Sequence, residues 1–151
     1  MRTLAVDLGT RRVGLALGDA GGRLATPLDV LAVRDADAAT GPVAAVVRAE
    51  GVGRVVVGLP LNMDGTIGPA ARAAVAWGRR LAAVVGPGVT ILFVDERLSS
   101  FAAEQHLTDR KRAGERLTRA KRKRQLDALA AADFLQAFLD GRAPAIDVTG
   151  W

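Results

Sequence analysis

The order of the apolar segments is the feature that most constrains the fold of this chain. Apolar runs at residues 3–8, 12–18 and 24–33 follow one another with only turns between them, although Pro27 weakens the third. Such a succession predicts three strands paired as an antiparallel meander. Farther along, apolar runs alternate with helical patterns, and strands separated by helices are normally parallel. The sequence therefore predicts an α/β fold with one mixed five-stranded sheet flanked by helices.

Glycine and proline mark the ends of the later elements. Thr40-Gly41-Pro42 is typical of a helix start, and Gly86-Pro87-Gly88 is typical of a helix end. The elements predicted after residue 33 are a helix at 40–50, a strand at 54–59, a helix at 69–85, a strand at 89–94, a helix from Ser99 or Ser100 to about 107, and a helix from about 120 to 139. The all-apolar stretches at 55–57 and 91–94 predict that both later strands are central in the sheet.

Length and composition exclude several kinds of protein. A chain of 151 residues suits one domain with a substantial core, which we expect at residues 1–140, followed by a poorly ordered C-terminal tail at 141–151. The absence of cysteine and the single histidine, His106, exclude disulfide scaffolds, cysteine nucleophiles and multi-histidine metal sites. We expect no membrane span and no signal peptide, and a cytoplasmic location, because no long apolar run occurs and Asp7 interrupts the first one.

The positive charge of the chain is concentrated in one segment. Residues 110–124 hold nine basic side chains and one acidic side chain, a local charge of +8, whereas the whole chain carries +5. The remainder is therefore mildly acidic. A concentrated basic segment predicts contact with a polyanion at one place, and a solvated helix end is the alternative interpretation.

Three acidic positions are unusual for their surroundings. Asp7 interrupts the first apolar strand, and Asp95 and Glu96 follow directly on the last one. At 100° per residue, Asp127 falls on the apolar face of the final helix. A buried carboxylate requires a metal ion, a charged partner or a proton. An arginine partner is the alternative for Asp7 and Asp127, and an ordinary polar strand end is the alternative for Glu96.

Together, the three acids at Asp7, Glu96 and Asp127 can meet at one edge of a mixed sheet. Carboxylates without histidine or cysteine form a hard oxygen site, which suits Mg²⁺ or Mn²⁺. Two such ions can activate water and stabilise the leaving oxygen in phosphodiester cleavage. The basic segment leads directly into the helix that carries Asp127, so the phosphate-binding charge adjoins the predicted chemistry.

Four stretches in this order resemble the motifs of a known family. They are residues 7–14 (DLGTRRVG), 57–65 (VGLPLNMDG), 95–100 (DERLSS) and 126–131 (LDALAA). They resemble the YqgF family of pre-16S rRNA nucleases, whose members are also described as Holliday junction resolvases. The resemblance covers about residues 3–140 and implies an RNase H-like fold, with Asp7, Glu96 and Asp127 as catalytic metal-binding residues.

The resemblance also implies a function. It implies maturation of the 5′ end of 16S ribosomal RNA, with pre-16S rRNA as the partner. From the chemistry of the three acids, we expect two Mg²⁺ or Mn²⁺ ions as cofactors. Resolution of four-way DNA junctions is the alternative, and it rests on fold kinship. Junction cleavage would call for a symmetric pair of sites, and nothing in the sequence indicates a dimer.

Basic and amide side chains near these motifs are candidates for binding nucleic acid. They are Arg11, Asn62, Arg97, Arg119, Lys121, Arg122, Lys123 and Arg124. Each also has a structural interpretation: Asn62 suits a turn, Arg97 can pair with Asp95, and Arg11 can be solvated. A non-enzymatic RNA-binding factor for ribosome assembly is a further alternative, although it leaves three acids near a polyanion site without a purpose.

Overall fold

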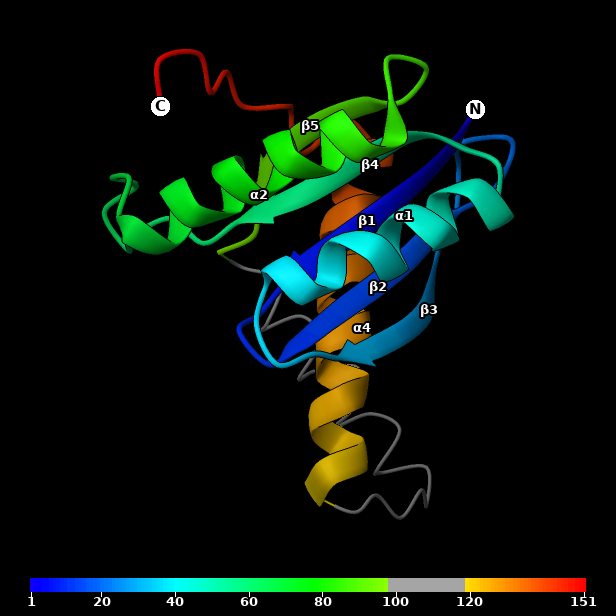
Figure 1. The fold of residues 1–151 in the computed structure, drawn as a ribbon, viewed down its shortest axis with the longest axis horizontal. Helices are drawn as coiled ribbons and strands as arrows, with labels where there is room; N and C mark the ends of the chain where they lie inside the picture. Colours follow the sequence, from blue (N-terminus) through cyan, green and yellow to red (C-terminus); the bar gives the residue numbers. More distant parts are fainter. Residues whose placement is uncertain (98–118) are drawn as a thin grey trace.

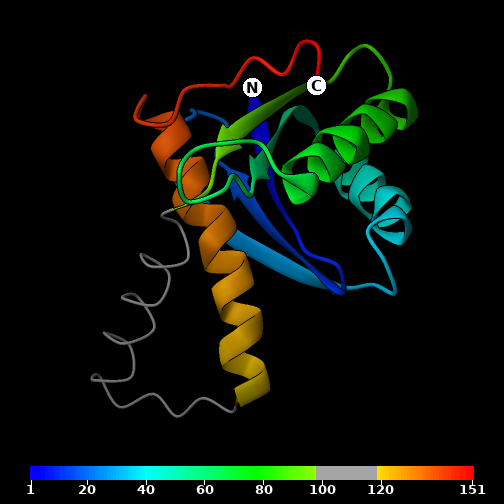
Figure 2. The same cartoon turned by 90° about the vertical axis from the view of Figure 1, so that its left-hand side faces the viewer.

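A computed structural model describes residues 1–97 and 119–151 of the chain. Its elements are β1 (Arg2–Leu8), β2 (Arg12–Gly18), β3 (Ala25–Ala32), the short 3-10 helix η1 (Asp37–Ala39), α1 (Thr40–Ala49), β4 (Val52–Leu59), α2 (Pro69–Val85), β5 (Thr90–Asp95) and α4 (Arg119–Leu139). Helices α1 and α2 cover one face of the sheet, and α4 crosses the other (Figures 1 and 2). The helix predicted at 99–107, His106 and most of the basic segment lie outside the described residues.

The five strands form one mixed sheet in the order β3-β2-β1-β4-β5. The first three pair antiparallel, whereas β1, β4 and β5 run parallel. The predicted meander followed by parallel strands is therefore confirmed. Pro27 lies in β3 at the sheet edge, where a strand tolerates the missing N–H donor.

The prediction that the strand at 91–94 is central is wrong, because β5 forms the other edge of the sheet. Phe93 and Val94 are nevertheless buried, by α2 on one face and by α4 on the other. The open side of β5 is partly covered by the C-terminal tail, whose Ile146 N–H donates to the Phe93 carbonyl at 2.8 Å. An apolar strand therefore does not need a neighbouring strand on both sides to be buried.

The tail at 141–151 packs against the domain. Ile146, Val148 and Trp151 contact the core on the α2 side. Arg79 of α2 donates hydrogen bonds to the carbonyls of Trp151 at 2.8 Å and Val148 at 3.3 Å. These contacts contradict the expectation of a poorly ordered tail. That expectation rested on local composition, whereas the tail docks on an edge that only the tertiary structure creates.

The two faces of the sheet carry side chains of different size. The face toward α1 and α2 carries large apolar residues, such as Leu4 and Val57, which share a core cluster with the fully buried Trp77 of α2. The face toward α4 carries small residues, including Ala5 and Ala16. Small residues let a helix approach the sheet closely. Among the helices in the described parts of the chain, none is long and apolar enough to cross a membrane.

Candidate active site at the carboxyl ends of the parallel strands

Two acidic side chains meet at the carboxyl ends of the parallel strands. Asp7 lies near the end of β1, and Glu96 follows the last residue of β5. Strand β4 lies between these two strands, with Val57 opposite Val6 and Gly58 opposite Val94. Because side chains alternate along a strand, Asp7 lies on the same face as Ala5, the face toward α4.

Gly58 provides the space in which the two carboxylates meet. A Cβ atom at this position would overlap the Glu96 Oε2 atom and would lie 2.9 Å from the ring of Phe134 on α4. The missing side chain therefore lets Glu96 reach across β4 toward Asp7. Gly58 lies inside β4, within the strand predicted at 54–59, but the sequence analysis assigned it no role in the site. The available signal was a glycine within a valine-rich strand, which often marks close approach of another group.

Asp7 and Glu96 share a hydrogen bond that requires one proton. Burial raises the pKa of Glu96 to about 9, and the nearby negative charge of Asp7 adds to this effect. Burial also raises the pKa of Asp7, although the hydrogen bond from Glu96 opposes that shift. At neutral pH, Glu96 therefore keeps its proton and donates it to Asp7, so the pair holds one negative charge instead of two.

The stability of the metal-free protein should fall as the pH rises. Glu96 has a pKa of about 9 in the fold and an ordinary value of 4.5, so the folded state binds the extra proton. This contribution is complete below about pH 4.5 and is lost progressively as the pH rises toward 9. Each unit of pKa difference corresponds to about 1.4 kcal/mol. Urea unfolding in EDTA at pH 6, 7, 8 and 9 measures the slope.

Glu96→Gln is the matched control for this titration. The amide has nearly the same shape and can still donate to Asp7, but it has no proton to lose in this range. The variant should show a flatter dependence of stability on pH. Equal slopes for the two proteins would contradict the shared-proton interpretation.

Asp127 lies on α4, close to this pair. Its negative charge contributes to the raised pKa of Asp7. Its Oδ2 atom also forms an ion pair with Nε of Arg12 at 2.9 Å, and both side chains are about one-third exposed or less. An arginine partner is thus present for Asp127, as the alternative interpretation anticipated. A Cβ atom at Gly14, opposite Asp7 in β2, would overlap the Asp127 backbone carbonyl, so this glycine sets how closely α4 approaches.

The three carboxylates suit a hard divalent cation, but one of them, Asp127, forms an ion pair with Arg12. Asp7 and Glu96 offer carboxylate oxygens in a water-poor setting, and their shared proton marks a place where a cation would relieve charge repulsion. Over residues 1–97 and 119–151, no group of three acidic or imidazole side chains stands ready to hold a metal ion. Asp127 would therefore have to exchange Arg12 for the cation.

The predicted nucleic-acid contacts are dispersed around this site. Arg11 is exposed in the turn after β1. Asn62 is also exposed, and its amide donates to Thr66 Oγ1 at 2.9 Å, which is the turn role considered above. Arg97 forms an ion pair with Asp95 at 2.7 Å and donates to the Met63 carbonyl.

The basic candidates on α4 share the first turns of that helix. They are Arg119, Lys121, Arg122, Lys123 and Arg124. The structure describes the backbone of these turns, but their side chains lie outside the described residues. Their assignment to nucleic acid stays a prediction.

Comparison with known proteins assigns the chain to a family. The sequence model of RuvX, described as a Holliday junction resolvase, matches residues 1–141. The chain belongs to the RuvX family. Together with the relatives of this chain that are provisionally named pre-16S rRNA nucleases, this match confirms the resemblance drawn from the four motifs. The chain is thus a nuclease-family enzyme, a hydrolase of phosphodiester bonds.

Individual relatives resemble the chain along nearly its whole length. A protein from Anaeromyxobacter sp. (strain K), provisionally named a pre-16S rRNA nuclease, is 46% identical over 144 residues, which cover 95% of this chain and all of the relative. A protein of the same provisional name from Acidiphilium cryptum is 40% identical over 139 residues, covering 92% of this chain and 84% of the relative.

A solved structure supports the RNase H-like fold. Thermus thermophilus RuvC in complex with a Holliday junction superposes with a TM-score of 0.56 over 97% of this chain and 99% of that one. The sequence identity is 17%, so the likeness concerns the fold. The predicted fold class is therefore confirmed.

Proposed function

We propose that this chain is a divalent-metal-dependent nuclease that matures the 5′ end of pre-16S rRNA. The observation that carries the proposal is the meeting of Asp7 and Glu96 over Gly58, at the end of the parallel strands in a nuclease-family fold. The choice of RNA is supported by the names of the relatives, which are pre-16S rRNA nucleases. A nuclease for a ribosomal precursor would act in the cytoplasm.

The proposed roles follow from the positions of the three acids. Asp7 interacts with both of the other acids, since Glu96 and Asp127 each affect its pKa. Asp7 would therefore be the central ligand for divalent cations, and Glu96 and Asp127 would complete the set of residues that hold them. Bound divalent ions would activate water and stabilise the charge that develops on the phosphate.

Protons and charged partners must rearrange when the site is loaded. Glu96 would lose the proton that it shares with Asp7, because a carboxylate binds a cation in its charged form. Arg12 would release Asp127 and become available to the substrate, where its guanidinium suits a phosphate group. Arg11, Arg97 and the basic turns of α4 would supply further phosphate contacts.

Holliday junction resolution is the second candidate, because the family is described by that activity and RuvC shares the fold. It would require two copies of this chain with symmetric sites. The two candidates differ in substrate but use the same three acids.

A parallel cleavage assay would test the proposal. One substrate is a 16S precursor with its 5′ extension, and the other is a four-way DNA junction, each incubated with Mg²⁺, Mn²⁺ or EDTA. We expect cleavage of the precursor with metal and none in EDTA. Symmetric cleavage of the junction alone would transfer the function to DNA. Tight RNA binding that is unchanged in EDTA, with neither substrate cleaved by any metal, would favour a non-enzymatic RNA-binding factor.

A further inference from the structure

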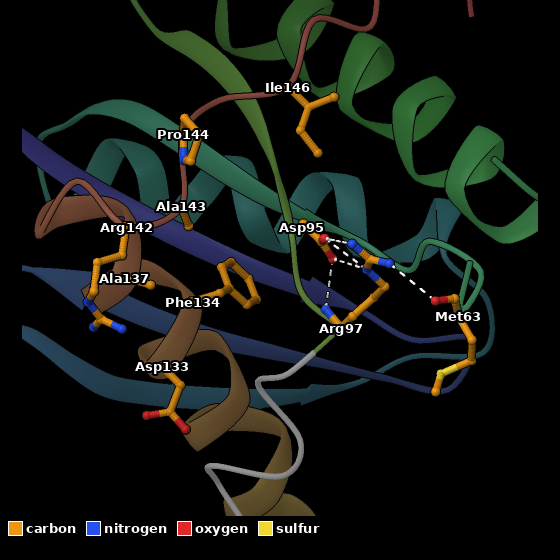
Figure 3. Close-up of a pocket in the computed structure, with 10 residues that line it drawn as sticks. All are labelled: Met63, Asp95, Arg97, Asp133, Phe134, Ala137, Arg142, Ala143, Pro144 and Ile146. Carbon is orange, nitrogen blue, oxygen red and sulfur yellow. Dashed lines mark hydrogen bonds and ion pairs between the residues drawn. The ribbon is translucent and has the colours of Figure 1, made fainter. Parts of the chain in front are cut away.

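A cavity of about 770 Å³ lies along the outer edge of β5, beside the acidic site (Figure 3). Its walls come from the loop after β4, the end of β5, the last turns of α4 and the C-terminal tail. The lining residues are Met63, Asp95, Arg97, Asp133, Phe134, Ala137, Arg142, Ala143, Pro144 and Ile146. This volume falls in the range of pockets that enclose small organic ligands.

Phe134 lies between the cavity and the acidic site and borders both. The ring of Phe134 lines the cavity, and it also borders the space above Gly58 that receives Glu96. Arg97, the residue after Glu96, lines the cavity as well. A part of the substrate bound in the cavity would therefore lie next to a phosphate held at the acids. One nucleic-acid strand could occupy both places.

Two guanidinium groups lie at opposite sides of this cavity. In Figure 3, the Phe134 ring lies between Arg142 on one side and the Asp95–Arg97 pair on the other. Arg97 is held in place by Asp95 at 2.7 Å, so its charge is largely balanced. Arg142 is 66% exposed and binds Asp140 with one nitrogen at 3.1 Å, which leaves other donors accessible to a ligand.

The lining combines these charges with an apolar wall. Phe134, Ala137, Pro144 and Ile146 provide carbon surface, and Asp95 and Asp133 add acceptors. The two acids balance the two guanidinium groups, so the lining has no net positive charge to hold a free anion. A group that offers an apolar ring, ring N–H donors and a single phosphate matches this lining, and a nucleotide has these parts.

We propose that this cavity binds one unpaired nucleotide of the RNA strand, adjacent to the phosphate that is cleaved. Arg142 contacts the phosphate of that nucleotide, and its base lies against the apolar wall. This inference rests on the proposed function, since it names a substrate subsite for the same reaction. Four of the lining residues lie beyond residue 141, where the family match ends, so the tail completes the subsite.

Photo-crosslinking tests the location of the strand. The probe is a ten-nucleotide single-stranded RNA with one 4-thiouridine, bound to the full chain in EDTA so that no cleavage occurs. We expect one 4-thiouridine position to crosslink to a peptide containing residues 134–146. Crosslinks confined to other peptides would overturn the proposal, and equal crosslinking of the matching DNA would overturn the assignment to RNA.

A pair of charge variants tests the role of Arg142. Arg142→Gln should weaken binding of the same RNA about tenfold in fluorescence anisotropy, as expected for loss of a charged hydrogen bond. Arg34→Gln is the control, because Arg34 is 87% exposed and pairs only with its neighbour Asp35 among the contacts described. Equal affinities for the two variants would overturn the proposal. Ala143→Leu, which fills the cavity without changing charge, should also weaken binding.

The results separate this inference from the proposed function. If the wild type cleaves RNA while Arg142→Gln binds normally and residues 134–146 are not crosslinked, the subsite is refuted and the nuclease stands. If no substrate is cleaved but residues 134–146 are crosslinked, the cavity binds RNA, whereas the nuclease assignment fails and with it the placement of the nucleotide next to a cleaved phosphate. Thermal unfolding of each variant ensures that only folded proteins are compared.

Discussion

Asp7→Asn should reduce metal-dependent cleavage by about 10³-fold or more. Glu96 and Asp127 both affect the pKa of Asp7, so Asp7 holds the central position in the proposed site. Loss of a central metal ligand removes several kcal/mol of charge stabilisation in the transition state, and about 4 kcal/mol corresponds to that factor. The rate is measured on the RNA precursor at saturating Mg²⁺.

The same variant should not be less stable than the wild type when metal is absent. At pH 8 Glu96 is still below its pKa of about 9, so the pair holds one buried negative charge. The asparagine removes that charge, and its Oδ1 atom can still accept the hydrogen bond from Glu96. We therefore expect an equal or higher Tm in EDTA at pH 8, together with loss of any rise in Tm on adding Mg²⁺. Lost activity accompanied by a lower Tm in EDTA would point to misfolding instead.

Asp35→Asn is the matched control for Asp7→Asn. It makes the same chemical change at an exposed position in the segment before α1. Its cleavage rate and its response to Mg²⁺ should equal those of the wild type. Retention of more than a tenth of the activity by Asp7→Asn would refute the assigned role.

Gly14→Ala should separate α4 from the sheet and displace Asp127. The added Cβ would overlap the Asp127 carbonyl, which is backbone and cannot rotate away. Overpacking of this kind typically costs about 1–3 kcal/mol of the free energy of unfolding. A shift of about 1 Å in a catalytic group can lower the rate about 10²-fold. Urea unfolding and the cleavage rate measure the two effects.

Gly88→Ala is the control for the effect of an added methyl group. A Cβ atom at Gly88 would meet nothing within 4 Å, so both stability and activity should stay close to the wild-type values. If Gly14→Ala also behaved as the wild type, α4 would be free to shift without cost, and its close packing would not position Asp127.

Local sequence patterns predicted most of the fold, because strand order and helix periodicity are local properties. The meander, the parallel strands and the final helix all follow from apolar spacing along the chain. The edge position of β5 could not be predicted in this way. Continuous apolar character reports burial on both faces, whereas the place of a strand in the sheet depends on which neighbours pair with it.

The candidate site was likewise predictable only in part. Asp7, Glu96 and Asp127 were candidates because acids are unusual in their surroundings. Their partners were not predictable: the Asp7–Glu96 hydrogen bond depends on the order β1-β4-β5, and the Arg12–Asp127 pair depends on how α4 crosses β2. These contacts join segments that lie far apart in the sequence.

The sequence by itself determined the fold class, the family and the identity of the candidate acids, because each depends on residue type and spacing along the chain. Only the tertiary structure decided that Gly58 makes room for Glu96, that Gly14 sets the approach of α4, and that the tail covers the edge of β5. The physical reason is close packing: the absence of one Cβ atom matters only where another element approaches within contact distance.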